Sequence, residues 1–365
     1  MSRTVLFYGC GWAATNIWMP NLRRAGSFDF LCIDQHLFAQ AAARGAVPPC
    51  LVLDSVEDLA AQTIDLAIVA SPNSSHAEHA QALLTRGITT IVEKPVCLSR
   101  QDCAAMSDTA RSSGAQLLRS CASCYDPHFR AFVDLVAGFD VSEILTVRAE
   151  WTRTAGVPSS KWLTSARHAV AGSSLDLGWH LLECVAMLLG YQEMDLKDAS
   201  FRFPDASGTA FARWYGTEAS GPEPVVDVDL AASLCLETAG GTSVDIKTSW
   251  DEEVSNDAVR FTVAGDRFAL ELETIFGLSR NGPRQMGITG HRHGERVDIR
   301  LAAKTPGRAH EIMIRQYAAA GFDPELLDQD LGQLAVLATA AEQIISQHDA
   351  CREQALGSGD HHVSG

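Results

Sequence analysis

The first third of the chain alternates short apolar runs with longer segments rich in Ala, Leu and Gln. The segments between the runs, such as residues 77–86 and 101–112, have the composition of helices. The runs are rich in β-branched and aromatic residues and predict strands at Thr4–Tyr8, Phe28–Ile33, Leu66–Ala70, Thr89–Val92 and from Gln116 to Leu118. Strands that alternate with helices form βαβ units, so residues 1–124 are predicted to form an α/β domain with a doubly wound parallel sheet.

After about residue 125 the rhythm of apolar positions changes. Helices are predicted over His128–Val136, Ser174–Leu189 and Leu326–Ser346. Strands follow one another directly at Glu143–Trp151, Asp229–Glu237, Ser243–Trp250, Arg260–Ala264 and Phe268–Leu272. This pattern predicts an α+β domain with a mixed or antiparallel sheet over residues 125–350. Residues 291–293 are interpreted as a solvated loop, and residues 351–365 as a disordered tail.

Composition and charge narrow the possible partners. The chain has 365 residues, which suggests roughly two domains at about 150 residues each. A net charge of −16 argues against nucleic acid and anionic membrane surfaces, both of which need clustered Lys and Arg. No apolar run approaches the length of a membrane span, and the N-terminus lacks a secretory pattern. With ten scattered cysteines, we expect a reduced, cytoplasmic protein that acts on a small molecule.

A glycine-rich loop follows the first predicted strand and opens the first helix. It reads Gly9-Cys10-Gly11-Trp12-Ala13-Ala14 and matches G-x-G-x-x-A. In this pattern the first glycine permits a tight turn, the second lets the backbone approach a pyrophosphate, and the alanine keeps helix and strand close. Amides at the helix start would hold the phosphates. The alternative is a glycine-rich turn that binds nothing.

An acidic residue ends the second predicted strand. Asp34 follows the loop near the spacing of about 20 residues that places a carboxylate on ribose hydroxyls. A carboxylate there repels a 2′-phosphate, and the next residues, Gln35-His36-Leu37, include no Arg or Lys to hold one. The pattern therefore predicts NAD rather than NADP. The alternative is a residue in a surface turn.

Two further segments follow predicted strands, at the edge where open α/β sheets bind ligands. One is Ser71-Pro72-Asn73-Ser74-Ser75-His76, and the other is Glu93-Lys94-Pro95. The ammonium of Lys94 can donate a charge-assisted hydrogen bond to a substrate hydroxyl or a developing alkoxide. For His76, a capping or packed role is the simpler interpretation.

The helix predicted over residues 174–189 carries an acid and a histidine one turn apart. Asp176 and His180 have i, i+4 spacing, which places both on one helix face. A carboxylate beside an imidazole raises its basicity and fixes its orientation, which suits removal of a proton from an alcohol near neutral pH. On spacing alone, such a pair is more often structural.

Taken in order, these motifs resemble the glucose–fructose oxidoreductase / inositol dehydrogenase / rhizopine-catabolism (Gfo/Idh/MocA) family over about residues 4–190. The resemblance implies an N-terminal Rossmann domain and a C-terminal domain with an open-faced mixed sheet. It implies a homodimer or homotetramer, and transfer of a hydride between a nicotinamide cofactor and a hydroxyl or keto carbon of a sugar, aminosugar or cyclitol. Lys94 would orient the reacting oxygen, His180 would exchange its proton, and Asp176 would support the histidine or the substrate.

The resemblance also implies which residues bind the cofactor and the substrate. Cofactor-binding positions are Gly9, Cys10, Gly11, Trp12, Ala13, Asp34, Ser71, Pro72, Asn73, His76, Glu93, Lys94 and Pro95. Candidate substrate contacts are Ser123, Tyr125 and Trp162. No metal is expected, because the close pair Cys121 and Cys124 has no second pair at zinc-site spacing.

The sequence departs from the family pattern near the predicted substrate site. Ser123-Cys124 stands where many members have an Asn-Arg or Arg-Arg pair, and the loss of a guanidinium leaves the substrate open. Ala171-Gly172-Ser173-Ser174 replaces a triple glycine, and Glu183 replaces an aspartate. Three other activities stay open: an NAD-binding sensor without turnover, an NAD-using lyase or glycosidase, and an imine or dihydrodiol reductase.

Overall fold

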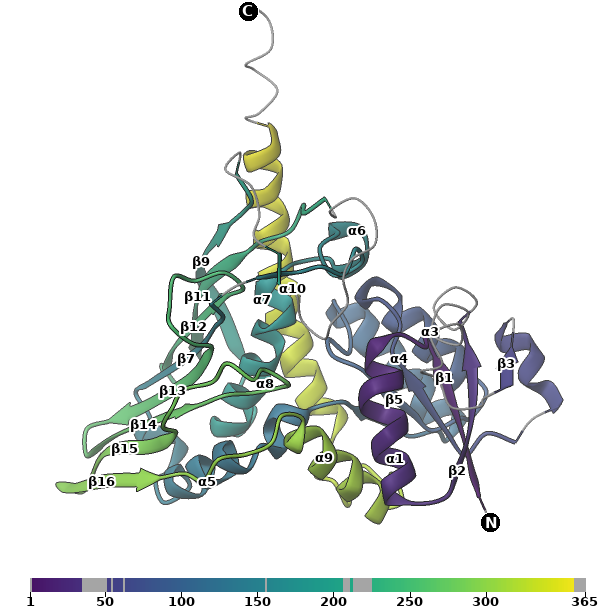
Figure 1. The fold of residues 1–365 in the computed structure, drawn as a ribbon, viewed down its shortest axis with the longest axis horizontal. Coiled ribbons are helices and arrows are strands. Elements are labelled where there is room, and N and C mark those ends of the chain that lie inside the picture. Colours follow the sequence, from purple (N-terminus) through teal and green to yellow (C-terminus); the bar gives the residue numbers. More distant parts are fainter. Residues whose placement is uncertain are drawn as a thin grey trace, which may run out of the picture. The chain divides into compact units, whose positions relative to one another are not determined.

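The computed structural model describes residues 2–34, 51–53, 55–61, 63–154, 156–205, 211–212 and 225–357. The chain forms two compact units (Figure 1). The first unit contains residues 1–125 and 307–335, and the second contains residues 126–306 and 336–365. The sequence predicts residues 307–335 as part of the second domain. In the structure, this segment instead returns to the first unit.

A six-stranded parallel sheet forms the centre of the first unit, in the order β3-β2-β1-β4-β5-β6. Its strands are β1 (Arg3–Tyr8), β2 (Phe28–Ile33), β3 (Leu51–Leu53), β4 (Leu66–Val69), β5 (Thr90–Val92) and β6 (Leu117–Arg119). The five predicted strands are confirmed to within one residue at each end. The additional strand, β3, has too few residues to show a period of two.

The strand order of this sheet reverses between β1 and β4. Because βαβ crossovers are right-handed, such a reversal places the connecting helices on opposite faces and leaves a crevice at the carboxyl ends of the two strands. The helical segments are η1 (Ala14–Trp18), α1 (Met19–Ala25), η2 (Val56–Ala61), η3 (Asn73–Ser75), α3 (His76–Leu84), α4 (Arg100–Ser113) and η4 (Ala122–Tyr125). The loops after β1, β4 and β5, which carry the predicted motifs, therefore lie at one edge of the sheet.

The returning segment of the first unit is held by helix α9 (Arg308–Ala319), which contacts α1 and η4. Tyr317 on α9 is fully buried, and its hydroxyl lies 3.2 Å from Cys121 Sγ and donates to the Arg119 carbonyl at 2.5 Å. Gln329 Oε1 accepts from the Arg119 amide at 2.8 Å. These contacts join residues about 200 positions apart, which is why the division read from the sequence missed them.

An eight-stranded mixed sheet forms the second unit, in the order β16-β15-β14-β13-β7-β12-β11-β9. Only the β7–β12 pair is parallel among the described pairs of this sheet. Its strands are β7 (Thr146–Thr152), β9 (Met194–Arg202), β11 (Ala231–Thr238), β12 (Ser243–Ser249), β13 (Ala258–Gly265), β14 (Phe268–Thr274), β15 (Gly287–Arg292) and β16 (Glu295–Arg300). A short parallel pair, β8 (Val157–Pro158) and β10 (Phe211–Ala212), stands apart from it.

One face of the eight-stranded sheet is buried and the other is polar. Along β11, for example, Leu234 and Leu236 are buried, whereas Cys235 and Glu237 are exposed. The helical segments of this unit are α5 (Pro127–Val136), η5 (Val141–Glu143), α6 (Ala166–Ala169), α7 (Ser173–Asp176), α8 (Gly178–Leu188) and most of α10 (Leu331–Gly357). Helices α5, α7 and α8 contact the sheet. Within the described residues, no helix is both long and apolar enough to cross a membrane.

Three predictions about the second half of the chain were wrong in detail. The helix predicted over 174–189 is divided into α7 and α8 at Leu177, because hydrogen bonds to Asp229 hold its first turn. Residues 291–293 belong to the β15–β16 hairpin rather than to a loop. Strand β15 pairs with β14, and the polar composition of this stretch does not indicate that pairing. Residues 351–357 continue helix α10 rather than forming a disordered tail, since good helix formers such as Arg, Glu, Gln and Leu occupy this stretch. Residues 358–365 lie outside the described part of the chain.

The two-faced sheet predicts opposite outcomes for neighbouring residues. Leu270 on β14 is fully buried, whereas Glu271 is exposed. Leu270→Ala should lower the free energy of unfolding by about 2–5 kcal/mol, because the cavity left by the side chain adds to the lost transfer energy. Glu271→Ala should change it by less than about 0.5 kcal/mol. Urea unfolding of both variants tests this, and equal losses would show that the assigned faces are wrong.

Candidate functional site

The predicted nucleotide loop packs against the main chain that follows β4. Gly9 has a φ of +89°, and a Cβ on it would lie 2.6 Å from the Ser71 amide nitrogen and 2.7 Å from the Ala70 carbonyl carbon. A side chain at Gly9 would thus collide with main chain, which cannot move aside cheaply. The loop continues through Cys10 and Gly11 to Trp12 and Ala13, and then enters η1.

Asp34 stands beside this loop, at the end of β2. Its Oδ2 accepts a hydrogen bond from the Cys10 amide at 2.9 Å. Residues 35–37, whose lack of Arg and Lys argues against a 2′-phosphate site, lie outside the described residues. The position of Asp34 and the close approach at Gly9 fit a dinucleotide whose pyrophosphate lies on the loop and whose ribose reaches the carboxylate.

Glu93 connects three parts of the first unit. Its Oε1 accepts from the Trp18 indole nitrogen at 2.6 Å and from the Ser120 hydroxyl at 3.0 Å, and its Oε2 accepts from the Lys94 amide at 3.1 Å. Trp18 belongs to η1, and Ser120 follows β6. One carboxylate therefore fixes the start of the Glu93-Lys94-Pro95 segment against the first helical turn and against the neighbouring strand end. The Lys94–Pro95 peptide is cis.

His76 joins the two loops that follow β4 and β5. Its Nδ1 lies 2.6 Å from the Pro95 carbonyl oxygen and its Nε2 lies 2.8 Å from the Ser71 carbonyl oxygen. Burial lowers the pKa of His76, and the two carbonyls oppose this effect. Both ring nitrogens thus face main chain, which is the packed role that the sequence favoured. Pro72 and Asn73 lie between Ser71 and His76, at the start of η3.

Exposure distinguishes the residues predicted to be reactive in both units. In the first unit, Glu93 and Lys94 are half-buried between the buried residues 92 and 95. In the second unit, the structure describes every residue from 171 to 180, and Asp176 and His180 alone among them are not buried. Because the neighbouring residues are buried, packing holds the backbone while each of these side chains remains partly accessible to a ligand.

Asp176 and His180 are held by aromatic side chains of the second unit. Asp176 ends α7, and its Oδ2 accepts from the Trp250 indole nitrogen at 3.1 Å. His180 lies on α8, with its ring centroid 5.6 Å from that of Trp151. Trp250 and Trp151 are both buried. The acid–histidine pair therefore has the fixed backbone and oriented carboxylate that proton exchange with an alcohol requires.

The three candidate substrate contacts have different environments. Ser123 is buried in η4. Tyr125 ends the same turn, where its ring packs edge-on against Tyr317 at 5.7 Å, and burial raises its pKa above the ordinary range. Trp162 in the second unit is 36% exposed. Ser123 and Tyr125 thus form part of the packing that holds α9, and Trp162 presents its surface to solvent.

Sequence reasoning missed several residues that shape these segments. Trp18 and Trp250 donate to the two key carboxylates, yet each is distant in sequence and looks like an ordinary core residue. His310, on the returning helix α9, lies near enough to Glu93 and Lys94 for their charges to affect its pKa, which burial lowers. In the described residues, no group of three or more His, Cys, Asp or Glu side chains is arranged to hold a metal ion.

Two descriptions of known protein families match the chain, one in each half. A family described as "Oxidoreductase family, NAD-binding Rossmann fold" matches residues 3–120. A second description, "GFO/IDH/MocA C-terminal domain", matches residues 129–271. The two matches correspond to the parallel sheet of the first unit and to most of the mixed sheet of the second.

Individual proteins are similar over most or part of the chain. A putative UDP-kanosamine synthase oxidoreductase subunit from Amycolatopsis mediterranei (strain S699) is 31% identical over 330 residues, which cover 89% of this chain and 90% of that protein. The D-glucoside 3-dehydrogenase of Escherichia coli (strain K12) is 31% identical over 133 residues, 35% of this chain and 36% of that protein. A 3-ketoreductase from Actinomadura kijaniata, solved with NADP and TDP-benzene, has the same fold, with a TM-score of 0.70 and 15% identity over 96% of this chain and 98% of that chain.

The close approach at Gly9 predicts loss of dinucleotide binding when a side chain is added. Gly9→Ala should weaken NADH binding at least about tenfold, because the new Cβ pushes the loop away from β4. Titration of NADH by its fluorescence measures the effect. Gly26→Ala is the matched control, since its Cβ would meet only the Phe28 side chain at 3.1 Å. Unchanged NADH affinity in Gly9→Ala would separate this loop from the cofactor.

Proposed function

The chain belongs to the GFO/IDH/MocA family of NAD-binding oxidoreductases, and we propose that it oxidises or reduces carbon 3 of a glucose-type sugar carried on a nucleotide. The nucleotide part rests on the relative named for UDP-kanosamine, to which nearly the whole chain aligns. The carbon position rests on the glucoside 3-dehydrogenase and the 3-ketoreductase.

The observation that carries this proposal is the exposure of the reactive groups. Lys94 in the first unit is partly exposed next to buried residues, and so are Asp176 and His180 in the second unit. The Glu93 carboxylate accepts from the Trp18 indole and from the Lys94 amide, and the Asp176 carboxylate accepts from the Trp250 indole. A sensor without turnover would need no such set of an ammonium, an acid and an imidazole.

Each of these side chains has a distinct task in the proposed reaction. His180 takes the proton of the sugar hydroxyl during oxidation and returns it during reduction. Lys94 donates a hydrogen bond to the same oxygen and stabilises the negative charge that develops on it. Asp176 stabilises the charge and orientation of the imidazole. A bound nicotinamide would accept the hydride from the carbon that bears this oxygen during oxidation, and would donate a hydride to that carbon during reduction.

The loss of either side chain should lower turnover without abolishing cofactor binding. With UDP-glucose and NAD⁺, we expect His180→Ala to lower kcat about 10²–10⁴-fold and Lys94→Ala about 10²–10³-fold, measured at the absorbance of NADH. Lys197→Ala, on the edge strand β9 of the eight-stranded sheet, is the matched control. Full activity in His180→Ala would contradict the assigned proton transfer, and faster turnover of myo-inositol than of UDP-glucose would contradict the substrate class.

The cofactor preference is proposed from the position of Asp34. Its carboxylate stands beside the loop at the distance of a hydrogen bond, so a 2′-phosphate on the same ribose would place two negative charges close together. We therefore propose NAD over NADP. The open, polar face of the eight-stranded sheet is proposed as the contact of a homodimer or homotetramer.

Removal of the carboxylate should relax this preference. Asp34→Ser should raise kcat/KM for NADP⁺ roughly tenfold or more, which corresponds to about 1.4 kcal/mol, and lower it for NAD⁺. Asp29→Ser, which removes an exposed acid from the same strand, should leave the ratio of the two cofactors unchanged. If Asp34→Ser and Asp29→Ser give the same ratio, Asp34 does not select the cofactor.

A further inference from the structure

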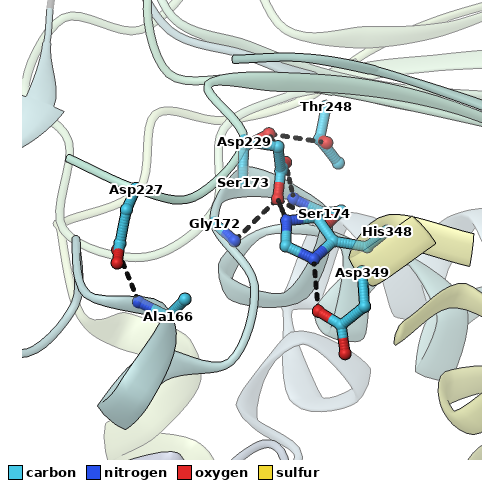
Figure 2. Close-up of polar contacts among 9 residues, drawn as sticks. All are labelled: Ala166, Gly172, Ser173, Ser174, Asp227, Asp229, Thr248, His348 and Asp349. Atoms are coloured by element: carbon cyan, nitrogen blue, oxygen red, sulfur yellow. Dashed lines mark hydrogen bonds and ion pairs between the residues drawn. The ribbon is translucent and has the colours of Figure 1, made fainter. Parts of the chain in front are cut away.

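A fully buried carboxylate lies at the start of the turn that carries Asp176. Asp229, which precedes β11, is 0% exposed. Its Oδ1 accepts from the Gly172 amide at 2.7 Å and from the Ser174 hydroxyl at 2.8 Å, and its Oδ2 accepts from the Ser174 amide at 2.8 Å and the Ser173 hydroxyl at 2.9 Å (Figure 2). A buried carboxylate needs such a complete set of donors, and the set in turn restricts where the donors can lie.

The main chain of Asp229 also touches the turn. The Asp229 carbonyl accepts from the Ser173 amide at 3.0 Å, and a Cβ on Gly172 would lie 1.9 Å from that carbonyl oxygen. Ser173 Oγ lies 3.1 Å from Thr248 Oγ1 on β12. The start of α7 is therefore pressed directly onto the segment before β11, and glycine at 172 is what permits this contact.

Helix α10 reaches the same carboxylate from the other side. His348 is fully buried, and its Nε2 lies 3.4 Å from Asp229 Oδ1, while its Nδ1 lies 3.3 Å from Asp349 Oδ1 (Figure 2). The rings of Phe201 and Phe203 lie 5.3 Å and 5.4 Å from the imidazole ring. The imidazole thus packs among aromatic rings with Nε2 facing Asp229, so α10 packs against the carboxylate that holds the turn.

The held turn leads directly to the reactive side chains. The amides of Leu175 and Asp176 donate to the Gly172 carbonyl at 3.1 Å and 2.8 Å, so the anchored residue is hydrogen-bonded to the residue that bears the carboxylate. After Leu177 the chain enters α8, which carries His180. A shift at Gly172 would therefore move Asp176 by about the same amount and would tilt the start of α8.

We propose that Asp229, supported by His348, is a positioning residue for the reaction: it holds the start of α7 so that Asp176 and His180 keep their working orientation. Asp229 is enclosed by protein and does not itself contact the substrate. The inference rests on the proposed roles of Asp176 and His180. It adds Asp229, which lies more than fifty positions from Gly172 and Ser174 in the sequence and affects turnover only through the turn.

Two aspartates in one segment allow a matched test. Asp229→Asn keeps the size of the side chain but turns an amide donor toward the turn, whereas Asp227→Asn alters an acid whose Oδ1 accepts from the Ala166 amide at 2.6 Å, at the start of α6 (Figure 2). With UDP-glucose and NAD⁺, Asp229→Asn should lower kcat about 10²-fold, the loss expected when a catalytic group moves by about 1 Å. Asp227→Asn should stay within about threefold of the unchanged protein.

Three readouts separate positioning from general destabilisation. In Asp229→Asn, the Kd for NADH should be unchanged, because the cofactor site belongs to the first unit. The acidic limb of the pH profile of kcat/KM should shift, because the surroundings of His180 change. In selectively labelled protein without substrate, the histidine NMR signal of His180, assigned by its loss in His180→Gln, should move in Asp229→Asn and stay in place in Asp227→Asn.

A second variant guards against a failure of Asp229→Asn to fold. Ser174→Ala removes one hydroxyl donor to Oδ1 and keeps the backbone of the turn, so it should lower kcat about tenfold and move the same NMR signal by a smaller amount. The proposal is overturned if kcat, the pH profile and the His180 signal are unchanged in the folded variants, or if kcat falls only in proportion to lost NADH binding. Full activity of His180→Ala would overturn the proposed function instead, whatever Asp229→Asn does.

Discussion

The end of β1 meets the end of β4 with no room for a side chain, and the rest of the first unit is arranged around this contact. Gly9 can approach the main chain of Ala70 and Ser71 because it has no Cβ and adopts a positive φ. The approach depends on parallel strands whose order reverses between β1 and β4. Because all strands run in one direction, the loops after β1, β4 and β5 are brought to one edge, and motifs separated by more than eighty residues lie near one another.

Buried or half-buried carboxylates then fix what the sheet has brought together. Glu93 accepts hydrogen bonds from Trp18, Ser120 and the Lys94 amide, so it joins the first helical turn, the end of β6 and the lysine segment. Asp229 does the same in the second unit for the start of α7. A carboxylate removed from water is stable only when its oxygens are filled with donors. The donors are thereby held in place, and the segments that carry Lys94 and Asp176, the proposed reactive residues, are held with them.

The second unit encloses the backbone around Asp176 and His180, which we propose to be reactive. Around Asp176 and His180, α7 and α8 are packed against β7, β11 and β12, and this packing shields their backbone from solvent. Trp250 and Trp151 place large rigid rings beside the two polar groups. The indole of Trp250 can pack and donate one hydrogen bond at the same time, which suits the boundary between an apolar core and a site that must hold a sugar.

The sequence by itself determined five of the six strands of the parallel sheet and the glycine loop with Asp34, and it is enough to propose Lys94, Asp176 and His180 as reactive residues, because these features depend on periods and spacings within a few residues. Only the tertiary structure decided that residues 307–335 return to the first unit, that β15 and β16 extend the second sheet, and that Trp18, Trp250 and Asp229 hold the reactive segments. Apart from the pairing of β15 and β16, these contacts join residues between about 55 and 210 positions apart. Local periodicity carries no information about them, since the partner of a buried polar group is selected by the packing of whole sheets and helices and not by its neighbours in the chain.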